Sequence, residues 1–266
     1  MNKVGIIGMG NMGEAILKAF LKNGMQKTSI LCAETKPVRA SFIVKTYGIK
    51  CFENPENVVK KSDFIILAVK PQDSKIVLQP VASFFNDKKV LISILAGITT
   101  SNILSIVGKA VKVVRIMPNI CVKVGEGAMG ITSNKLAGID DVKAVKAMFS
   151  SIGKTVEVSE ELMDAVTALG GSGPAFVLLF LEAMIDAGVK LGLPRDKASI
   201  ISSQVLKGTI KMLETENLHP TLMREMITSP GGTTIAGLAA MEQGAFKGNV
   251  IRAIEEACKR SKELSL

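Results

Sequence analysis

The chain has 266 residues, of which 47% are apolar, and a formal net charge of +9. This length favours two domains, and such an apolar fraction without a low-complexity tract excludes a largely disordered protein. The positive charge suits anionic small molecules or simply a solvated lysine surface. The basic residues are dispersed with no interleaved aromatic side chains, which argues against nucleic acid as a partner.

Cysteine spacing and hydropathy restrict the class of protein further. The four cysteines (32, 51, 121 and 258) show no C-x-x-C spacing, so neither a metal site nor a disulfide framework is expected. Glycines and Glu14 interrupt the apolar run at the amino terminus, unlike a cleavable signal. No uncharged apolar stretch approaches the roughly 18 residues of a membrane span. We therefore expect a cytoplasmic protein with no membrane partner.

The first part of the chain alternates short β-rich runs with helical patterns. Strands are predicted at 3–7, 29–34, 63–69, 89–95 and 112–118, with amphipathic helical segments between them, such as 14–24 and 74–85. The runs at 63–69 and 89–95 are almost continuously apolar, as strands covered on both faces are. This alternation predicts an α/β domain over residues 1–159, built on a parallel sheet with helices on both faces.

A glycine motif follows the first predicted strand directly. "GMGNMG" (8–13) has G-x-G-x-x-G spacing and precedes a helical pattern. In that context the glycines permit a tight turn, close helix packing and close approach of a pyrophosphate to the helix N-terminus. We predict a Rossmann-type dinucleotide-binding loop formed by Gly8, Met9, Gly10, Asn11, Met12 and Gly13. The alternative is a glycine-rich turn without a ligand.

The end of the second predicted strand is expected beside the adenosine ribose. Glu34 lies there, and an acid at this position pairs with ribose hydroxyls and favours NAD. Thr35, Lys36 and Arg39 follow and could instead hold a 2′-phosphate, although the two basic residues could equally be solvated. The sequence therefore leaves NADPH and NADH open as cofactors.

Two further strand ends are candidate cofactor contacts, because the carboxyl ends of parallel strands line the binding crevice. "AVKP" contributes Ala68, Val69, Lys70 and Pro71, and "MPN" contributes Asn119, which offers both a donor and an acceptor. An ordinary strand terminus and a turn asparagine are the alternatives. The single histidine, His219, lies beside a proline and is expected in a turn. A reaction carried by a nicotinamide does not require a histidine base.

From about residue 160 the pattern becomes entirely helical. Helical segments without strand signals cover 159–169, 174–193, 194–213 and 219–227, so residues 160–266 are predicted to form an all-helical domain. The helix at 174–192 is apolar around much of its circumference. A small helical domain cannot bury such a helix alone, and we expect it to form a subunit interface.

"TSPGGTTIAGLAAME" (228–242) places a proline and two glycines before an apolar helix. A helix start leaves backbone N–H groups unpaired, and glycines let a ligand approach the main chain. The stretch therefore suggests a cradle for a small anion. Simple N-capping by Ser229 or Thr233 is the alternative.

Together, "GMGNMG", "AVKP", "MPN", "GGSGPAF" (170–176) and "SPGGTTIAGLAAME" resemble pyrroline-5-carboxylate reductase over essentially the whole chain. The resemblance implies a Rossmann NAD(P)-binding domain and a helical carboxy-terminal dimerisation domain. It implies NAD(P)H-dependent reduction of 1-pyrroline-5-carboxylate to L-proline, the last step of proline biosynthesis. It also implies homodimers that assemble further, commonly into decamers of five dimers.

The resemblance also implies roles for particular residues. By this resemblance the substrate carboxylate is bound by Ser229, Gly231, Gly232, Thr233 and Thr234. Thr234 also approaches the ring nitrogen as the catalytic residue. The dinucleotide contacts fall on 8–13, 34–36 and 68–71. One departure is that Ile120 and Cys121 follow "MPN", where the family has Thr-Pro.

Two other functions compete with this reading. A β-hydroxyacid dehydrogenase relative uses a lysine about one turn into the first long helix of its second domain, whereas here that helix has no lysine before Lys190. A non-enzymatic dinucleotide sensor does not need the "SPGGTT" cradle. NAD(P)H oxidation on addition of pyrroline-5-carboxylate distinguishes the reductase from the sensor.

Overall fold

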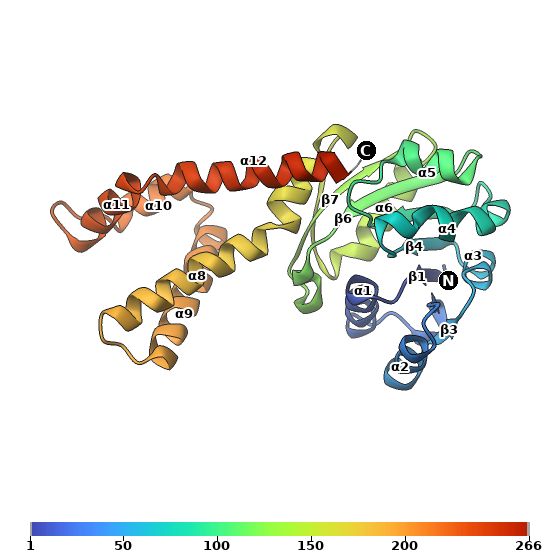
Figure 1. The fold of residues 1–266 in the computed structure, drawn as a ribbon, viewed down its shortest axis with the longest axis horizontal. Helices are drawn as coiled ribbons and strands as arrows, with labels where there is room; N and C mark the ends of the chain where they lie inside the picture. The colour runs from blue at the N-terminus through green and yellow to red at the C-terminus, as the bar shows by residue number, and fades with distance from the viewer. Residues whose placement is uncertain (1, 265–266) are drawn as a thin grey trace. The chain divides into compact units, whose positions relative to one another are not determined.

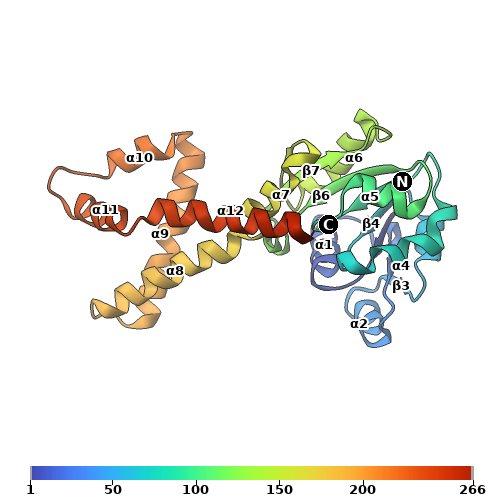
Figure 2. The same ribbon diagram turned by 45° about the horizontal axis from the view of Figure 1, so that its top comes forward.

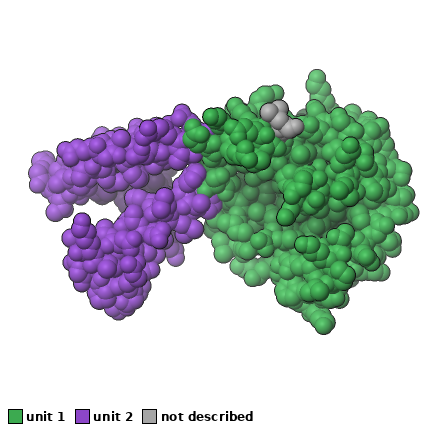
Figure 3. All heavy atoms as spheres, viewed as in Figure 1, with its two compact units in different colours: residues 1–172, 256–266 green, residues 173–255 purple. Residues whose placement is uncertain are grey.

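The computed structural model describes residues 2–264, which divide into two compact units (Figure 3). The first unit contains the residues up to 172 together with those from 256 onward, and the second contains residues 173–255. The predicted boundary after residue 159 differs from this division. Met163 is buried, and Asp164 accepts a hydrogen bond of 2.6 Å from the hydroxyl of Ser261, so this segment and the end of the chain pack in the first unit.

The first unit is built on one sheet (Figure 1). Its strand order is β3-β2-β1-β4-β5-β6-β7-β8. The strands are β1 (Val4–Ile7), β2 (Ile30–Ala33), β3 (Lys50–Phe52), β4 (Phe64–Leu67), β5 (Val90–Ser93), β6 (Lys112–Met117), β7 (Gly127–Ser133) and β8 (Gly153–Glu157). All five predicted strands are present. Strands β3, β7 and β8 were not predicted, and β7 pairs antiparallel with β6, so the sheet is mixed rather than wholly parallel.

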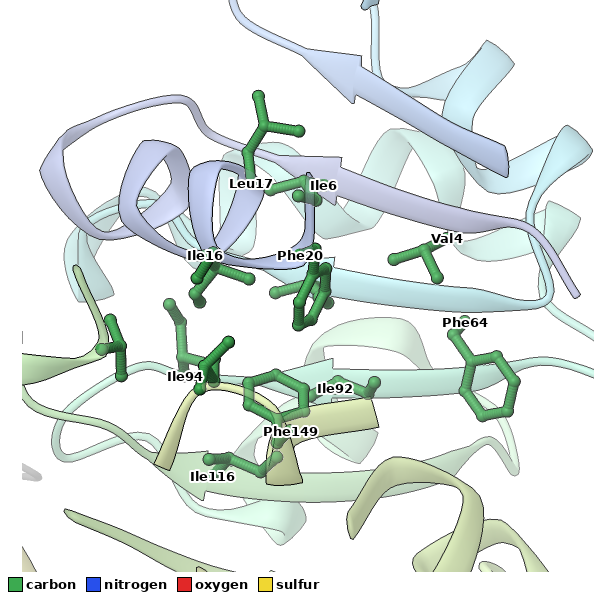
Figure 4. Packing of buried hydrophobic residues seen from close by; sticks show 14 of the residues in the cluster. Val4, Ile6, Ile16, Leu17, Phe20, Phe64, Ile92, Ile94, Ile116 and Phe149 are labelled. Atoms are coloured by element: carbon green, nitrogen blue, oxygen red, sulfur yellow. The ribbon is translucent and has the colours of Figure 1, made fainter. Parts of the chain in front are cut away.

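Helices cover both faces of this sheet, as its continuously apolar strands require. They are α1 (Asn11–Lys22), α2 (Pro37–Tyr47), α3 (Glu56–Lys61), α4 (Ser74–Leu78), α5 (Thr100–Val107) and α6 (Ile139–Ser150). Buried residues of α1, α2 and α6 form one core with one face of the sheet, and those of α3, α4 and α5 form another with the opposite face. In the first core, Phe20 of α1 meets Phe149 of α6 edge to face, with ring centroids 5.5 Å apart (Figure 4).

Short helical turns join this sheet to the helical part of the chain. The α-helix α7 (Met163–Val166) continues into a π-helical turn, Thr167–Gly171. The following helices are α8 (Gly173–Lys190), α9 (Arg195–Glu216), α10 (Pro220–Met226), α11 (Thr233–Gln243) and α12 (Phe246–Leu264). The predicted all-helical character of this part is confirmed.

In the second unit, α8 and α9 lie side by side (Figure 2). The glycine at 188 permits this approach, because a Cβ added there would lie 2.9 Å from the Cβ of Ala198. The rest of α8 is uncovered in the single chain: Val177, Leu178 and Leu179 are 55%, 62% and 67% exposed. Apolar side chains in such numbers on a helix surface are typical of a binding interface.

By length and composition alone, the helical run Glu160–Lys190 could cross a membrane, with 31 residues and a mean hydropathy of 1.6 in its most apolar window. The expectation from uncharged stretches did not identify this run. A π-helical turn and the glycines of the "GGSGP" segment lie within it. A helix that packs against another subunit of a soluble protein has the same apolar composition.

Candidate functional site

The loop between β1 and α1 has the geometry of a phosphate-binding turn. Gly8 has a φ of +94°, and a Cβ added there would lie 2.7 Å from the carbonyl oxygen of Ala68. A Cβ on Gly13 would overlap the carbonyl oxygen of Gly8. Both glycines are therefore needed by the packing of β1, α1 and the segment after β4. Gly10 differs, because it is the N-cap of α1, provides no side-chain cap and has open space where its Cβ would lie.

A cavity of about 640 Å³ opens beside this loop. Eight of the residues that the sequence predicts as cofactor contacts line it: Gly8, Gly10, Glu34, Thr35, Lys36, Ala68, Val69 and Lys70. Its volume is in the range of cofactor sites in proteins. The other predicted contacts do not line it: Met9, Asn11, Met12, Gly13, Pro71 and Asn119. Met9 is fully buried, and Gly13 is buried against the loop itself.

Two charged side chains bind the backbone of Met9, one at its N–H and one at its carbonyl oxygen. Its N–H donates to Oε2 of Glu34 at 2.9 Å, and its carbonyl accepts from Nε of Arg39 at 2.5 Å. Glu34 also accepts from the backbone N–H of Lys36 at 3.0 Å, through Oε1. The conformation of the glycine loop is therefore tied to the end of β2 and to the start of α2.

The Glu14 carboxylate fixes the guanidinium of Arg39. Its Nη2 pairs with Oε2 of Glu14, and Oε1 of Glu14 accepts from the Tyr47 hydroxyl at 2.6 Å. Burial and the hydrogen bond to Glu14 raise the pKa of Tyr47 to about 12. Burial alone would raise the pKa of Glu14, but the hydrogen bonds from Tyr47 and Arg39 outweigh it and leave this pKa below its ordinary value. The roles of Glu14 and Tyr47 could not be predicted from the sequence, since nothing in the pattern separates them from ordinary surface positions of helices.

The segment after β4 also lines the cavity. The N–H of Ala68 donates to the carbonyl of Ile7 at 2.8 Å, which extends the β1–β4 pairing to the edge of the glycine loop. Lys70 is exposed, and Pro71 begins a 3₁₀ turn, Pro71–Asp73. This turn and helix α4 bring four further residues to the cavity that the sequence did not indicate: Gln72 and Asp73 of the turn, and Ile76 and Val77 of α4.

Asn119 is 6% exposed and hydrogen-bonded through both ends of its amide. Its Nδ2 donates to the carbonyl of Gly170 at 3.0 Å, and its Oδ1 accepts from the N–H of Cys121 at 3.1 Å. These contacts hold the π-helical turn against the end of β6. They favour the turn interpretation over the cofactor contact, which stays a prediction.

The predicted anion cradle lies at the start of α11 in the second unit. Gly232 is the N-cap of this helix, with an extended backbone and no side-chain cap, so neither Ser229 nor Thr233 caps it as the alternative required. Gly231 has a φ of +67°, with open space where a Cβ would be. A Cβ on Gly232 would overlap Oγ of Ser229, which places that hydroxyl beside the first turn. Ser229 and Thr233 are exposed, and Thr234 is half-buried.

His219 has the turn role that its sequence context suggested. It is the N-cap of α10, and its Nδ1 accepts from the N–H of Thr221 at 3.3 Å.

Comparison with known proteins identifies the family. Residues 160–264 match the family model for pyrroline-5-carboxylate reductase dimerisation, and residues 3–97 match that for NADP oxidoreductase, coenzyme F420-dependent. The pyrroline-5-carboxylate reductase of Arabidopsis thaliana is 37% identical over 264 residues, which cover 99% of this chain and 95% of the relative. That of Methanosarcina acetivorans is 38% identical and covers 98% of this chain and 97% of its own.

The solved structures agree with these relatives. The crystal structure of Plasmodium falciparum pyrroline carboxylate reductase with NADP bound matches with a TM-score of 0.90 and 33% identity, covering 100% of this chain and 98% of that one. The resemblance seen in the sequence is thus confirmed, as is the combination of a Rossmann-type sheet domain with a helical dimerisation domain. The chain belongs to the pyrroline-5-carboxylate reductase family.

Proposed function

We propose that the protein reduces 1-pyrroline-5-carboxylate to L-proline with NADPH or NADH, the last step of proline biosynthesis. Full-length similarity to pyrroline-5-carboxylate reductases carries this proposal. It is supported by the presence, in this one chain, of a dinucleotide loop and of a helix start suited to a small carboxylate.

The residues at the first site fit a nicotinamide dinucleotide. Gly10 leaves space for a phosphate to reach the start of α1, where unpaired N–H groups and the helix dipole favour negative charge. Glu34, Thr35 and Lys36 would contact the adenosine ribose, and Ala68, Val69 and Lys70 line the same cavity. When bound, the reduced nicotinamide supplies the hydride, and the protein binds, orients and polarises.

The start of α11 would hold the substrate through its carboxylate. An anion at a helix N-terminus is stabilised by about 0.3–1 kcal/mol from the dipole, and charge-assisted hydrogen bonds add more. Gly231 and Gly232 leave the backbone accessible, and the hydroxyls of Ser229 and Thr233 are exposed for donation. These residues contribute binding and orientation.

Thr234 would touch the reacting imine as the catalytic residue. It follows the carboxylate cradle directly and is half-buried, which restricts its hydroxyl more than that of the exposed Thr233. A protonated iminium is the better hydride acceptor, so a substrate that arrives protonated needs no strong protein acid. Thr234 then orients the ring nitrogen, and alignment of the two reacting rings is the main contribution to rate.

The helical domain supports a homo-oligomer, because its match is to a dimerisation domain and the apolar side chains of α8 are exposed in the single chain. We infer a homodimer through this domain, and a decamer of five dimers as the larger assembly. We further infer a cytoplasmic protein that binds neither nucleic acid nor membrane. In this interpretation the apolar run Glu160–Lys190 is covered by a second subunit rather than by lipid.

The proposal is tested by the loss of nicotinamide absorbance on addition of 1-pyrroline-5-carboxylate, with L-proline identified as the product. Thr234→Ala should lower turnover about tenfold or more, because the nitrogen loses its orienting hydroxyl. Thr234→Ser keeps that hydroxyl and should retain most of the activity. The affinity for the dinucleotide should be the same in both variants. Wild-type turnover in Thr234→Ala overturns the residue assignment, and absence of oxidation by the wild type overturns the function.

A further inference from the structure

We infer that Glu34 makes this enzyme select NADH over NADPH, by accepting hydrogen bonds from the adenosine ribose and by repelling a 2′-phosphate. The inference rests on the proposed function only in assuming that the cavity beside the glycine loop binds a nicotinamide dinucleotide. The sequence left this choice open, because Lys36 and Arg39 stand next to Glu34. The contacts of these three side chains decide it.

Two backbone N–H groups fix the Glu34 carboxylate at the cavity wall. Oε2 accepts from Met9 at 2.9 Å and Oε1 accepts from Lys36 at 3.0 Å, so the carboxylate is tied to the glycine loop and to the start of α2. The side chain is half-buried and lines the cavity. A carboxylate has about four acceptor positions, so about two remain for a pair of ribose hydroxyls. A vicinal diol donates two hydrogen bonds, whereas a phosphorylated 2′-oxygen donates none.

The nearest guanidinium is already engaged within the protein. Arg39 pairs with Glu14 through Nη2 and donates to the carbonyl of Met9 through Nε. Its charge is therefore balanced by Glu14, and its orientation is fixed by the loop. To bind a 2′-phosphate with the usual two-pronged geometry, Arg39 would have to release these contacts.

The remaining charges near the ribose position are mixed. Lys36 and Lys70 line the cavity and are exposed, so their ammonium groups are hydrated and screened, and they attract the phosphates of both dinucleotides alike. Glu53 lines the same cavity and adds a second negative charge. A phosphate monoester carries a charge of about −1.5 to −2 at neutral pH. Placing it against a carboxylate that the backbone holds in position is unfavourable.

The experiment measures dissociation constants without substrate, by nicotinamide fluorescence for NADH and NADPH and by calorimetry for 5′-AMP and adenosine 2′,5′-bisphosphate. We expect the wild type to bind NADH about tenfold or more tightly than NADPH, and 5′-AMP more tightly than the bisphosphate. Glu34→Gln should weaken NADH and strengthen NADPH, which moves the ratio toward one. Lys36→Gln should weaken both dinucleotides by a similar factor, because it removes a screened charge and no fixed contact.

Three outcomes overturn the inference: equal or tighter binding of NADPH by the wild type, an unchanged ratio in Glu34→Gln, or a loss confined to NADPH in Lys36→Gln. The wild-type ratio decides the question even if Glu34→Gln does not fold. Because substrate is absent, failure here leaves the reductase function untouched. Conversely, a protein that selects NADH without reducing the imine refutes the proposed function alone.

Discussion

The two glycine-rich turns of this chain are alike in backbone geometry and opposite in packing. Helix α1 begins after Gly10 and α11 after Gly232, both N-caps are extended, and neither helix has a side-chain cap. A glycine with positive φ precedes each N-cap: Gly8 at +94° and Gly231 at +67°. Each turn therefore leaves the first N–H groups of a helix available to an anion.

Their surroundings differ. A Cβ on Gly8 would lie 2.7 Å from the carbonyl oxygen of Ala68, whereas a Cβ on Gly231 would meet nothing within 4 Å. Gly8 is thus required by the packing of the sheet and α1, whereas Gly231 is required only by its left-handed backbone and leaves open space for the proposed ligand. One sequence signal has two physical causes, and substitutions can separate them.

The largest effect is expected from Gly13→Ala. The added methyl overlaps the carbonyl oxygen of Gly8, so α1 must move away from the sheet. We expect the free energy of unfolding, measured with urea, to fall by about 1–3 kcal/mol. Most of the dinucleotide affinity, measured by fluorescence titration, should also be lost.

The matched control is Gly10→Ala, where the methyl meets open space. It should unfold within about 1 kcal/mol of the wild type yet bind the dinucleotide about tenfold more weakly. Equal stability of the two variants would contradict this assignment.

An intermediate effect is expected from Gly231→Ala. The left-handed backbone at 231 makes a Cβ unfavourable by about 1–2 kcal/mol, and the methyl would stand in the cradle that we propose for the substrate carboxylate. We expect the KM for pyrroline-5-carboxylate to rise about tenfold. Gly24→Ala is the control, because Gly24 has a φ of +88° and equally open surroundings but lies after α1. It should carry a similar strain with an unchanged KM. A KM that rises equally in both variants would mean that strain, not ligand contact, is measured.

The smallest effect concerns the support of the first turn. Because the pKa of Glu14 is lowered in the folded protein, its ionised form stabilises the fold above its ordinary pKa near 4.5. That contribution is lost as the pH falls through the folded-state pKa. At pH 6 the free energy of unfolding, measured by urea titration, should be higher for the wild type than for Glu14→Gln. The difference should be at most about 1 kcal/mol, since the Glu14–Arg39 pair is partly exposed. The difference should shrink as the pH falls below the ordinary pKa of 4.5 and through the lowered folded-state pKa. A difference that is constant with pH would exclude the charge as its cause.

The sequence predicted most of the fold for identifiable reasons. The runs at 63–69 and 89–95 are almost continuously apolar because both faces of the sheet are covered, and α1 follows its glycine loop directly. The strands it did not reveal are those with weak patterns. β3 has three residues, β7 begins with glycine and contains another, and β8 is largely exposed. Their pairing is decided by neighbouring strands, since strand propensity depends on context.

The candidate site divides in the same way. The glycine positions and the acid after β2 could be predicted from spacing, because a tight turn and a strand end impose local requirements. The commitment of Arg39 to Glu14 could not, since these residues are 25 positions apart and meet only when α2 packs beside α1. The engagement of Asn119 with Gly170, 51 residues away, was equally invisible.

The sequence by itself determined five of the eight strands, the all-helical second half, the two glycine turns and the family, because these depend on local backbone requirements and on motif order. Only the tertiary structure decided which glycines are enclosed by packing and which are open, and which charges near Glu34 are already paired. The reason is that enclosure and pairing are properties of atoms brought together from distant positions, and no local pattern specifies them.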